Sequence, residues 1–234
     1  MNLTGIKIDR IAMTTAAIEQ AGGSADAPGV SIFGCQVEIE PNGVTCDFTS
    51  QWTAVRDRCR TWSRDDLRRH QTARHYYDFY QRRLGIQPHE TPPSAVNLLI
   101  RFAIGDGAKR PIPLIHPAVD AGNVAQAENL IPVAVFDADA IEGDMLLDVA
   151  RFGDSLLPFG YERPQQIYAG RLVLRDQTKV LSEFCYRDGK AQAVTPTTRR
   201  LRILACQVPK VPRSKVVATL LRVVNLLENS HHIR

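Results

Sequence analysis

Apolar residues recur at helical spacing through much of the first half of the chain. We expect four helices, over residues 63–84, 94–105, 117–128 and 214–227. The first opens with Ser63-Arg64-Asp65-Asp66, which resembles a capping box, and Gly85 would end it. The third begins with Pro117, a residue that fits the first turn of a helix. The last would be capped by Ser214 and would bury a broad apolar face.

Short strand-like runs dominate the second half of the chain. The expected strands there cover residues 131–136, 145–150, 171–174, 180–186 and 201–206. Two short strands are expected earlier, over residues 30–35 and 37–39, and Pro41-Asn42-Gly43 indicates a turn into a third over residues 44–48. Asp188-Gly189 is a hairpin signal between two of the later strands. Helices first and strands later indicate the α+β class.

The composition is that of an ordinary globular protein. Of 234 residues, 44% are hydrophobic and 23% are charged, and a chain of this length buries roughly 70% of its unfolded surface without any staple. The net charge of +4 permits nucleic-acid binding without arguing for it. No apolar run approaches the ~20 residues of a membrane-spanning helix. We therefore expect a cytoplasmic protein that does not enter a membrane.

Cysteine and histidine spacing argues against a metal site. The five cysteines form no C-x-x-C pair, and no histidine stands at ligand spacing from them. An odd number of cysteines supports a disulfide framework no better. We expect small buried thiols in a reducing compartment, with no metal and no cofactor.

Six sequence blocks between Ala73 and Val208 carry a set of motifs. In chain order they are 76–88, 94–101, 112–123, 131–143, 170–175 and 187–198. Together they resemble the editing domain, or B3/B4 domain, of the phenylalanyl-tRNA synthetase beta subunit, in a free-standing form. Val119-Asp120-Ala121-Gly122-Asn123 is similar to the VDxxN motif of that family, and Phe136-Asp137 to its FD motif. The resemblance implies an α+β domain with three layers around a mixed β core of unusual topology.

The resemblance also suggests how the chain is divided. Residues 1–62 would be an N-terminal extension with short strands, residues 63–212 an editing-like, tRNA-binding domain, and residues 213–234 a C-terminal helix.

Four positions of this chain correspond to residues of the editing pocket in the synthetases. Asn123 keeps the family's Asn, whereas Ala134 stands at its His position. The positions of the family's Gly and of its tyrosine-reading Glu fall near Cys185 and Leu204. A small Ala and an aliphatic Leu suggest a site for an amino acid other than tyrosine.

Each candidate site residue has a structural alternative. An Asn in the middle of a helix competes with the backbone, so Asn123 either bonds to a nearby loop or contacts a ligand. Thr198 could cap a turn or steady a developing oxyanion, and His116 is either a structural hydrogen-bonding group or a general base. Arg187 and Asp188 either lie in a solvated turn or contact the substrate, because a guanidinium binds phosphate and carboxylate in a fixed fork. Cys185 fits a buried thiol better than a nucleophile, although it could still line the substrate site.

Basic residues follow the last motif block closely. Six of them would form the landing surface of a tRNA: Arg199, Arg200, Arg202, Lys210, Arg213 and Lys215. Phosphate contacts supply most non-specific affinity for nucleic acid, although such charges also occur on ordinary surfaces.

The sequence favours a deacylase that hydrolyses mischarged aminoacyl-tRNA in trans, as the resemblance implies. Its ligand would be aminoacyl-tRNA or a free amino acid. No Ser-His-Asp, Cys-His or metal constellation is visible, so catalysis would depend on positioning a water against the ester. Two alternatives stay open: transfer of the acyl group to an amine, and binding of an amino acid or tRNA without turnover.

Overall fold

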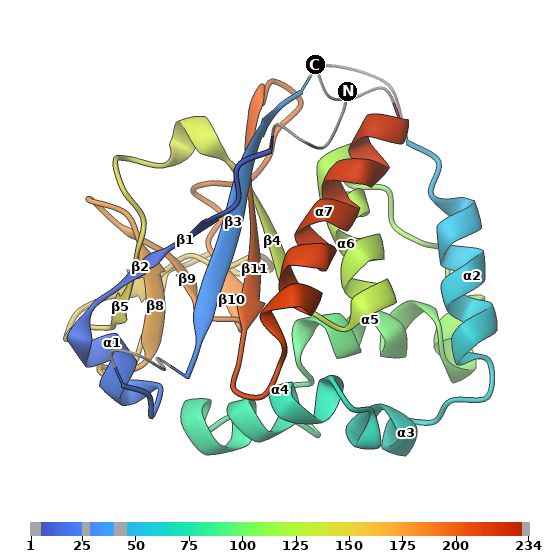
Figure 1. Cartoon of the computed structure of the whole chain (residues 1–234), viewed down its shortest axis with the longest axis horizontal. Coiled ribbons are helices and arrows are strands. Elements are labelled where there is room, and N and C mark those ends of the chain that lie inside the picture. The colour runs from blue at the N-terminus through green and yellow to red at the C-terminus, as the bar shows by residue number, and fades with distance from the viewer. Residues whose placement is uncertain (1–5, 25–28, 40–45, 231–234) are drawn as a thin grey trace.

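Two eight-residue strands form the centre of the protein. β3 (Ser31–Glu38) and β11 (Arg200–Gln207) pair antiparallel along their whole length, from Arg200 opposite Glu38 to Gln207 opposite Ser31. The structure, a computed structural model, describes residues 6–24, 29–39 and 46–230. β1 (Asp9–Arg10) and β4 (Val133–Asp137) flank the pair, which gives a sheet of order β1-β3-β11-β4. The other strands and the helices are arranged on the two faces of this sheet (Figure 1).

A second sheet lies on one face of the first. It contains β10 (Arg187–Asp188), β9 (Val180–Glu183), β8 (Leu172–Arg175), β5 (Leu146–Val149) and β2 (Ala12–Met13), in that order. Only β2 and β5 pair in parallel, so the sheet is mixed. The chain passes from β1 in one sheet to β2 in the other through Ile11 alone, which is buried. A two-stranded ribbon of β6 (Ser155–Leu156) and β7 (Gln165–Gln166) lies beside this sheet.

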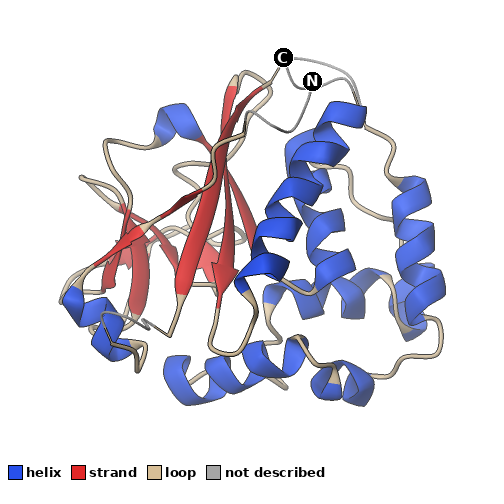
Figure 2. Cartoon of the chain, in the orientation of Figure 1, coloured by secondary structure: helices blue, strands red, loops and turns tan. Residues whose placement is uncertain are grey.

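Helices cover the opposite face of the central sheet (Figure 2). α6 (Pro117–Asn129) and α7 (Arg213–Asn229) pack against each other, and both contact the sheet, while α5 (Ser94–Phe102) and α2 (Thr49–Cys59) lie outside α6. α3 (Arg64–Arg69) and α4 (Ala73–Phe79) run along the end of the layers, and α1 (Thr15–Gln20) follows β2. Three short helical turns complete the set: η2 (Tyr80–Leu84), η3 (Gly105–Lys109) and η4 (Ala138–Ala140). The expected α+β class and three layers are confirmed.

The helix expected over residues 63–84 is in fact interrupted. Ser63 and Asp66 form the expected capping box, but α3 ends at His70, whose ψ of 131° is not helical. Nδ1 of His70 accepts the N–H of Thr72 at 3.2 Å, so the side chain offers the backbone an alternative to the helix. The chain then resumes as α4 and the π turn η2 up to Gly85, whose φ is 64°.

Other expectations were wrong as well. α7 begins after Pro212, so Ser214 lies inside its first turn and is not the cap. The turn between β9 and β10 is Phe184–Tyr186, with Cys185 at a φ of 50°, whereas Asp188 belongs to the strand. The separation of early helices from late strands also fails, because β3 pairs with β11. The turn expected at Pro41-Asn42-Gly43 lies outside the described residues, and residues 46–48 lead into α2 without a strand.

Two buried tyrosines fasten the α4–η2 region to both sheets. The hydroxyl of Tyr76 donates to the carbonyl of Cys206 at 2.6 Å, and that of Tyr80 donates to the carbonyl of Cys185 at 2.5 Å. Burial raises the pKa of both phenols well above the usual value, so they remain protonated donors.

Tyr80→Phe should lower the free energy of unfolding by about 1–3 kcal/mol, because the buried Cys185 carbonyl loses its donor. Urea denaturation would measure the loss. Tyr168→Phe is the matched control, since that side chain is 75% exposed and its loss of a hydroxyl should change little. Equal effects of the two substitutions would show that the Tyr80 hydrogen bond does not stabilise the fold.

Candidate functional site

The two sheets are joined at one edge and separate at the other. β1 and β2, consecutive in the chain, are edge strands of their sheets, and β4 and β10 are the opposite edge strands. A cavity of about 520 Å³ lies at this second edge, between β4, the β9–β10 turn and the helices α5 and α6. Gly122 of α6 also lines it, and a Cβ there would come within 3.0 Å of Val135 of β4, so this helix approaches the strand closely.

The edge of β4 that faces away from β11 lines this cavity. Cys206 N–H donates to Pro132 O at 3.1 Å, which fixes the alternation of the ladder. In an antiparallel pair every second residue directs its N–H and C=O away from its partner strand, so those of Val133 and Val135 point outward. Both residues line the cavity. The bridge between Phe136 and Ala193 occupies part of this edge, and the N–H groups of Val133 and Val135 remain as backbone donors for a ligand.

Two small residues flank Leu204 on the wall formed by the central sheet. In the strand register Leu204 lies opposite Gly34 of β3 on one side and Ala134 of β4 on the other. A Cβ on Gly34 would come within 2.7 Å of the Leu204 side chain, so this leucine leans over the glycine. Leu204 and Ala134 both line the cavity, whose wall is apolar at this point.

Asn123 projects from the middle of α6 into the cavity. Across the part of the chain that the structure describes, its side-chain amide makes no hydrogen bond, so the compensating contact expected for a mid-helix Asn is missing from the protein itself. An Asn costs roughly 0.7 kcal/mol against Ala in a helix interior. The uncompensated amide is available to a ligand.

Asp188 is the one carboxylate among the residues that line the cavity. It is partly exposed to this space, but protein surrounds its carboxyl group, and no hydrogen bond to it exists among residues 6–24, 29–39 and 46–230. Burial raises the pKa of Asp188 to about 7. A carboxylate held without a partner would bind a cationic ligand group.

Arg187, next to it, also lines the cavity but is held by a buried acid. Its Nε donates to Oε2 of Glu183 at 2.8 Å, and Arg171 contacts the other oxygen of Glu183 at 3.3 Å. The guanidinium also lies 5.2 Å from the centre of the Tyr186 ring. Arg187 is therefore fixed in orientation, with further N–H groups left for an anion.

The two thiols in the cavity wall are poor nucleophiles. Burial raises the pKa of Cys185 well above its usual value and that of Cys206 to about 12. Neither is ionised at neutral pH. Cys185 and Cys206 shape the wall instead.

Two predicted catalytic residues lie outside this lining. The hydroxyl of Thr198 donates to Oδ2 of Asp137 at 2.6 Å and accepts the N–H of Thr195, so it fixes a turn. His116 caps α6, with Nδ1 accepting the N–H of Ala118 at 3.2 Å. Asp137 in turn caps η4, with its side chain accepting the N–H of Asp139.

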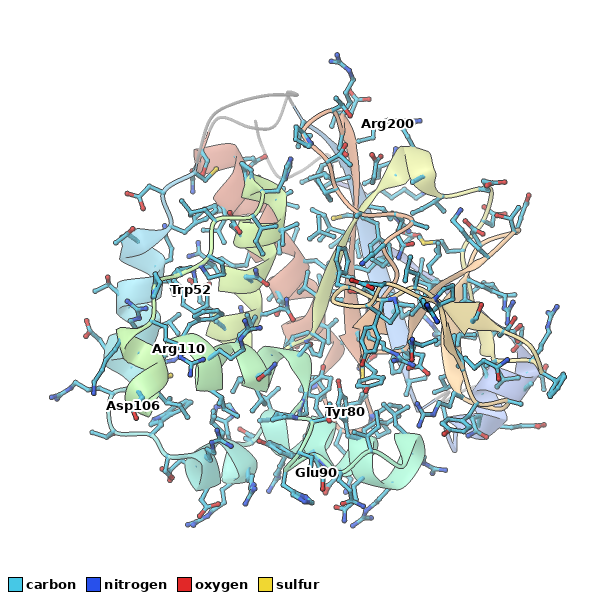
Figure 3. All side chains as sticks on the ribbon, turned by 180° about the vertical axis from the view of Figure 1, so that it is seen from behind. Trp52, Tyr80, Glu90, Asp106, Arg110 and Arg200 are labelled. Carbon is cyan, nitrogen blue, oxygen red and sulfur yellow. The ribbon has the colours of Figure 1, made fainter. Side chains whose placement is uncertain are left out.

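The six basic residues assigned to tRNA do not form one surface. Arg199 and Arg200 lie at one end of β11, and Figure 3 shows Arg200 at the opposite end of the molecule from Tyr80 and Glu90. Lys210, Arg213 and Lys215 follow the other end of the strand. Arg202 lies between the two groups, is 13% exposed and pairs with Asp9. Arg200 pairs with Asp139.

Sequence reasoning missed several cavity residues. They are Ser94, Arg101 and Gln126 on α5 and α6, Ser182 on β9, and Phe159 in the ribbon. Ser94 and Arg101 stand in the motif block 94–101 but were given no role in the site, and nothing in the local pattern distinguishes Gln126, Ser182 or Phe159. A second cavity of about 350 Å³ adjoins the first and shares Leu98, Phe102, Pro113 and Asn123 with it.

Two other features are absent from the described part of the chain. No three His, Cys, Asp or Glu side chains gather there as metal ligands would. None of its helices combines the length and the apolar character needed to span a membrane.

Comparison with known proteins identifies the family. The sequence model of the B3/4 domain matches residues 77–223, which confirms the resemblance seen in the motif blocks. No curated protein matches the chain. A solved N-terminal fragment of the phenylalanyl-tRNA synthetase beta subunit from Pyrococcus horikoshii is similar at 16% identity, with a TM-score of 0.42. That match covers 49% of this chain and 41% of the fragment.

Asp188→Asn should stabilise the protein at pH 8 by up to about 4 kcal/mol, and the gain should shrink towards pH 4. The folded pKa, about 7, lies above the model value of 3.8, so wild type loses stability as pH rises from about 4 to 7, when only the unfolded chain gives up the proton. Urea denaturation from pH 4 to pH 8 would measure this trend. A gain that does not vary with pH would contradict it.

Asp176→Asn is the control, because its effect on stability should have the opposite sign to that of Asp188→Asn. Burial would raise the pKa of Asp176, but hydrogen bonds from the backbone of Glu142, Thr178 and Lys179 and from the Lys179 ammonium lower it to about 2. Its removal should destabilise the protein at pH 7, and the loss should diminish as pH falls from about 4 towards 2.

Proposed function

We propose that this chain, which belongs to the B3/4 domain family, binds the acyl end of an aminoacyl-tRNA in its larger cavity and hydrolyses the ester. One observation carries the proposal. The cavity combines an apolar wall with an amide and a carboxylate, Asn123 and Asp188, that have no hydrogen-bonding partner among the described residues. An aminoacyl ester has the matching groups: a side chain, an ammonium and a carbonyl.

The ammonium group of the substrate would bind to Asp188. A desolvated carboxylate gains from pairing with a cation, because the partner offsets the cost of burying the charge. Binding would therefore favour the ionised form of Asp188 and lower its pKa. The side chain of the amino acid would lie against Leu204 and Ala134, where the wall is apolar.

The ester carbonyl would face α6 and the edge of β4. The amide of Asn123 and the outward N–H groups of β4 are donors that can stabilise the oxyanion as water attacks the carbonyl carbon. The bond from that carbon to the ribose oxygen then breaks, water supplies the proton to the ribose oxygen, and the products are a free amino acid and intact tRNA. Positioning and electrostatics carry this reaction without a protein nucleophile.

Asn123→Ala should lower the rate of deacylation by about tenfold, close to 1.4 kcal/mol for one lost polar contact. The fold should remain at least as stable, because Ala favours the helix over Asn. The measurement is release of labelled amino acid from each of the aminoacyl-tRNAs in turn.

Asn97→Ala on α5 is the matched control, since Asn97 lines neither cavity and should not affect the rate. Equal rates for both variants would remove Asn123 from the site. Product analysis distinguishes the alternatives: an acylated amine would indicate acyl transfer, and binding without product would indicate a binding module.

Tyrosine should be a poor substrate side chain. Leu204 lies at the motif's Glu position and cannot form a hydrogen bond with the hydroxyl of a tyrosyl substrate. A buried hydroxyl without a partner costs roughly 1–3 kcal/mol. In competition, tRNA charged with an aliphatic amino acid should be deacylated about tenfold faster than tRNA charged with tyrosine. Selective hydrolysis of tyrosine carried on the phenylalanine tRNA would contradict this.

A further inference from the structure

Exposed aromatic side chains gather on and beside one small ribbon of the protein. Across the described residues, the large hydrophobic side chains that remain exposed fall into two segments of the sequence, 114–115 and 152–168. The second segment contains the β6–β7 ribbon and has four aromatics: Phe152, Phe159, Tyr161 and Tyr168. Exposed aromatics concentrated in one place mark a binding surface more often than scattered ones do.

The tip of this ribbon lies at the mouth of the larger cavity. The backbone of Lys190 donates to Leu157 O at 2.8 Å, and the Lys190 ammonium donates to Tyr161 O at 2.5 Å. Pro158 also forms a β-bridge with Gly189, the residue that follows Asp188. Phe159 lines the cavity and is 59% exposed, so it stands at the opening.

Cationic groups accompany the aromatic tip. Arg101, exposed on α5, lines the cavity, and Lys190 is bonded to the tip itself. Glu162, which directly follows the tip residues 158–161, is exposed and forms no ion pair among the described residues. Aromatic faces with nearby cations are the combination that binds unpaired nucleotides, through base stacking and phosphate contacts.

We propose that the Pro158–Tyr161 tip is a stacking platform for the unpaired nucleotides at the 3′ end of an RNA whose acyl group enters the cavity. The inference rests on the proposed function and adds the element that recognises the RNA. A free amino acid has no base to stack on the platform, so the platform favours acyl groups that are carried on a nucleic acid.

Direct binding of an RNA hairpin with four unpaired 3′ nucleotides and no acyl group tests the platform, with fluorescence anisotropy as the readout. Phe159→Ala should weaken binding by about tenfold, since one base stacked on an aromatic ring contributes roughly that much. Phe159→Leu should remain weak, and Phe159→Trp should restore binding, because an aromatic face rather than apolar contact is needed. Phe152→Ala is the matched control: Phe152 is 99% exposed beside the same ribbon but does not line the cavity.

The outcomes separate the two proposals because the hairpin carries no ester. Loss with Ala and Leu, recovery with Trp and no change with Phe152→Ala would support the platform even if no aminoacyl-tRNA were deacylated. Equal affinities for wild type and all four variants would overturn it. So would a wild-type protein that deacylates aminoacyl-tRNA yet does not bind the hairpin, and deacylation would then stand without the platform.

Discussion

The pairing of β3 with β11 is the constraint on which the rest of the structure depends. It joins residues 31–38 to residues 200–207, which are far apart in the sequence. The central sheet and the cavity wall therefore form only when these two segments pair. Leu204 reaches its place beside Gly34 only through this register, and a slip by one residue would turn it to the other face of the sheet. Residues 1–62, read from the sequence as an extension, supply β1, β2, β3 and α2 to this arrangement.

The acids in and around the cavity differ from those elsewhere in the fold in whether they have hydrogen-bonding or ionic partners. Asp148 is bonded by Thr14 and paired with Arg175, Asp176 accepts several donors, and Glu183 is contacted by two arginines. Asp188 has no such partner among the described residues, and its pKa rises accordingly. Asp120 is less well compensated, since it accepts the N–H of Ile115 and burial still raises its pKa. The carboxylate of Asp188 differs in being both unpaired and part of the cavity lining, which supports the ligand-binding role proposed for it.

Hydrophobic periodicity predicted the helices and strands that bury regularly spaced apolar residues. The family motifs predicted residues that the fold brings together around the cavity. α6 begins at Pro117 as expected, and the later strands fall within a few residues of the expected runs. Asn123, Ala134, Cys185, Arg187, Asp188 and Leu204 line one cavity although they come from separate elements. α2 was missed because only Trp52, Val55 and Cys59 of its eleven residues are buried, too few for a clear stripe. Phe159 could not be predicted as a site residue from the sequence. The strands that flank it, β6 and β7, have two residues each and show no periodicity, and only the folded structure places Phe159 beside the cavity.

The cavity follows from how the chain connects its two sheets. At the β1–β2 edge a single buried residue, Ile11, joins them, and they cannot separate there. At the β4–β10 edge the link is the loop of residues 189–199, which Gln192 fastens to both sheets: its Nε2 donates to Leu181 O, and its carbonyl accepts the N–H of Asp137. Sheets held close at one edge and spanned by a loop at the other leave space between their open edges. Residues of α5, α6 and the ribbon tip also line that space, so the cavity is bounded by strand edges, a helix face and the aromatic side chain of Phe159.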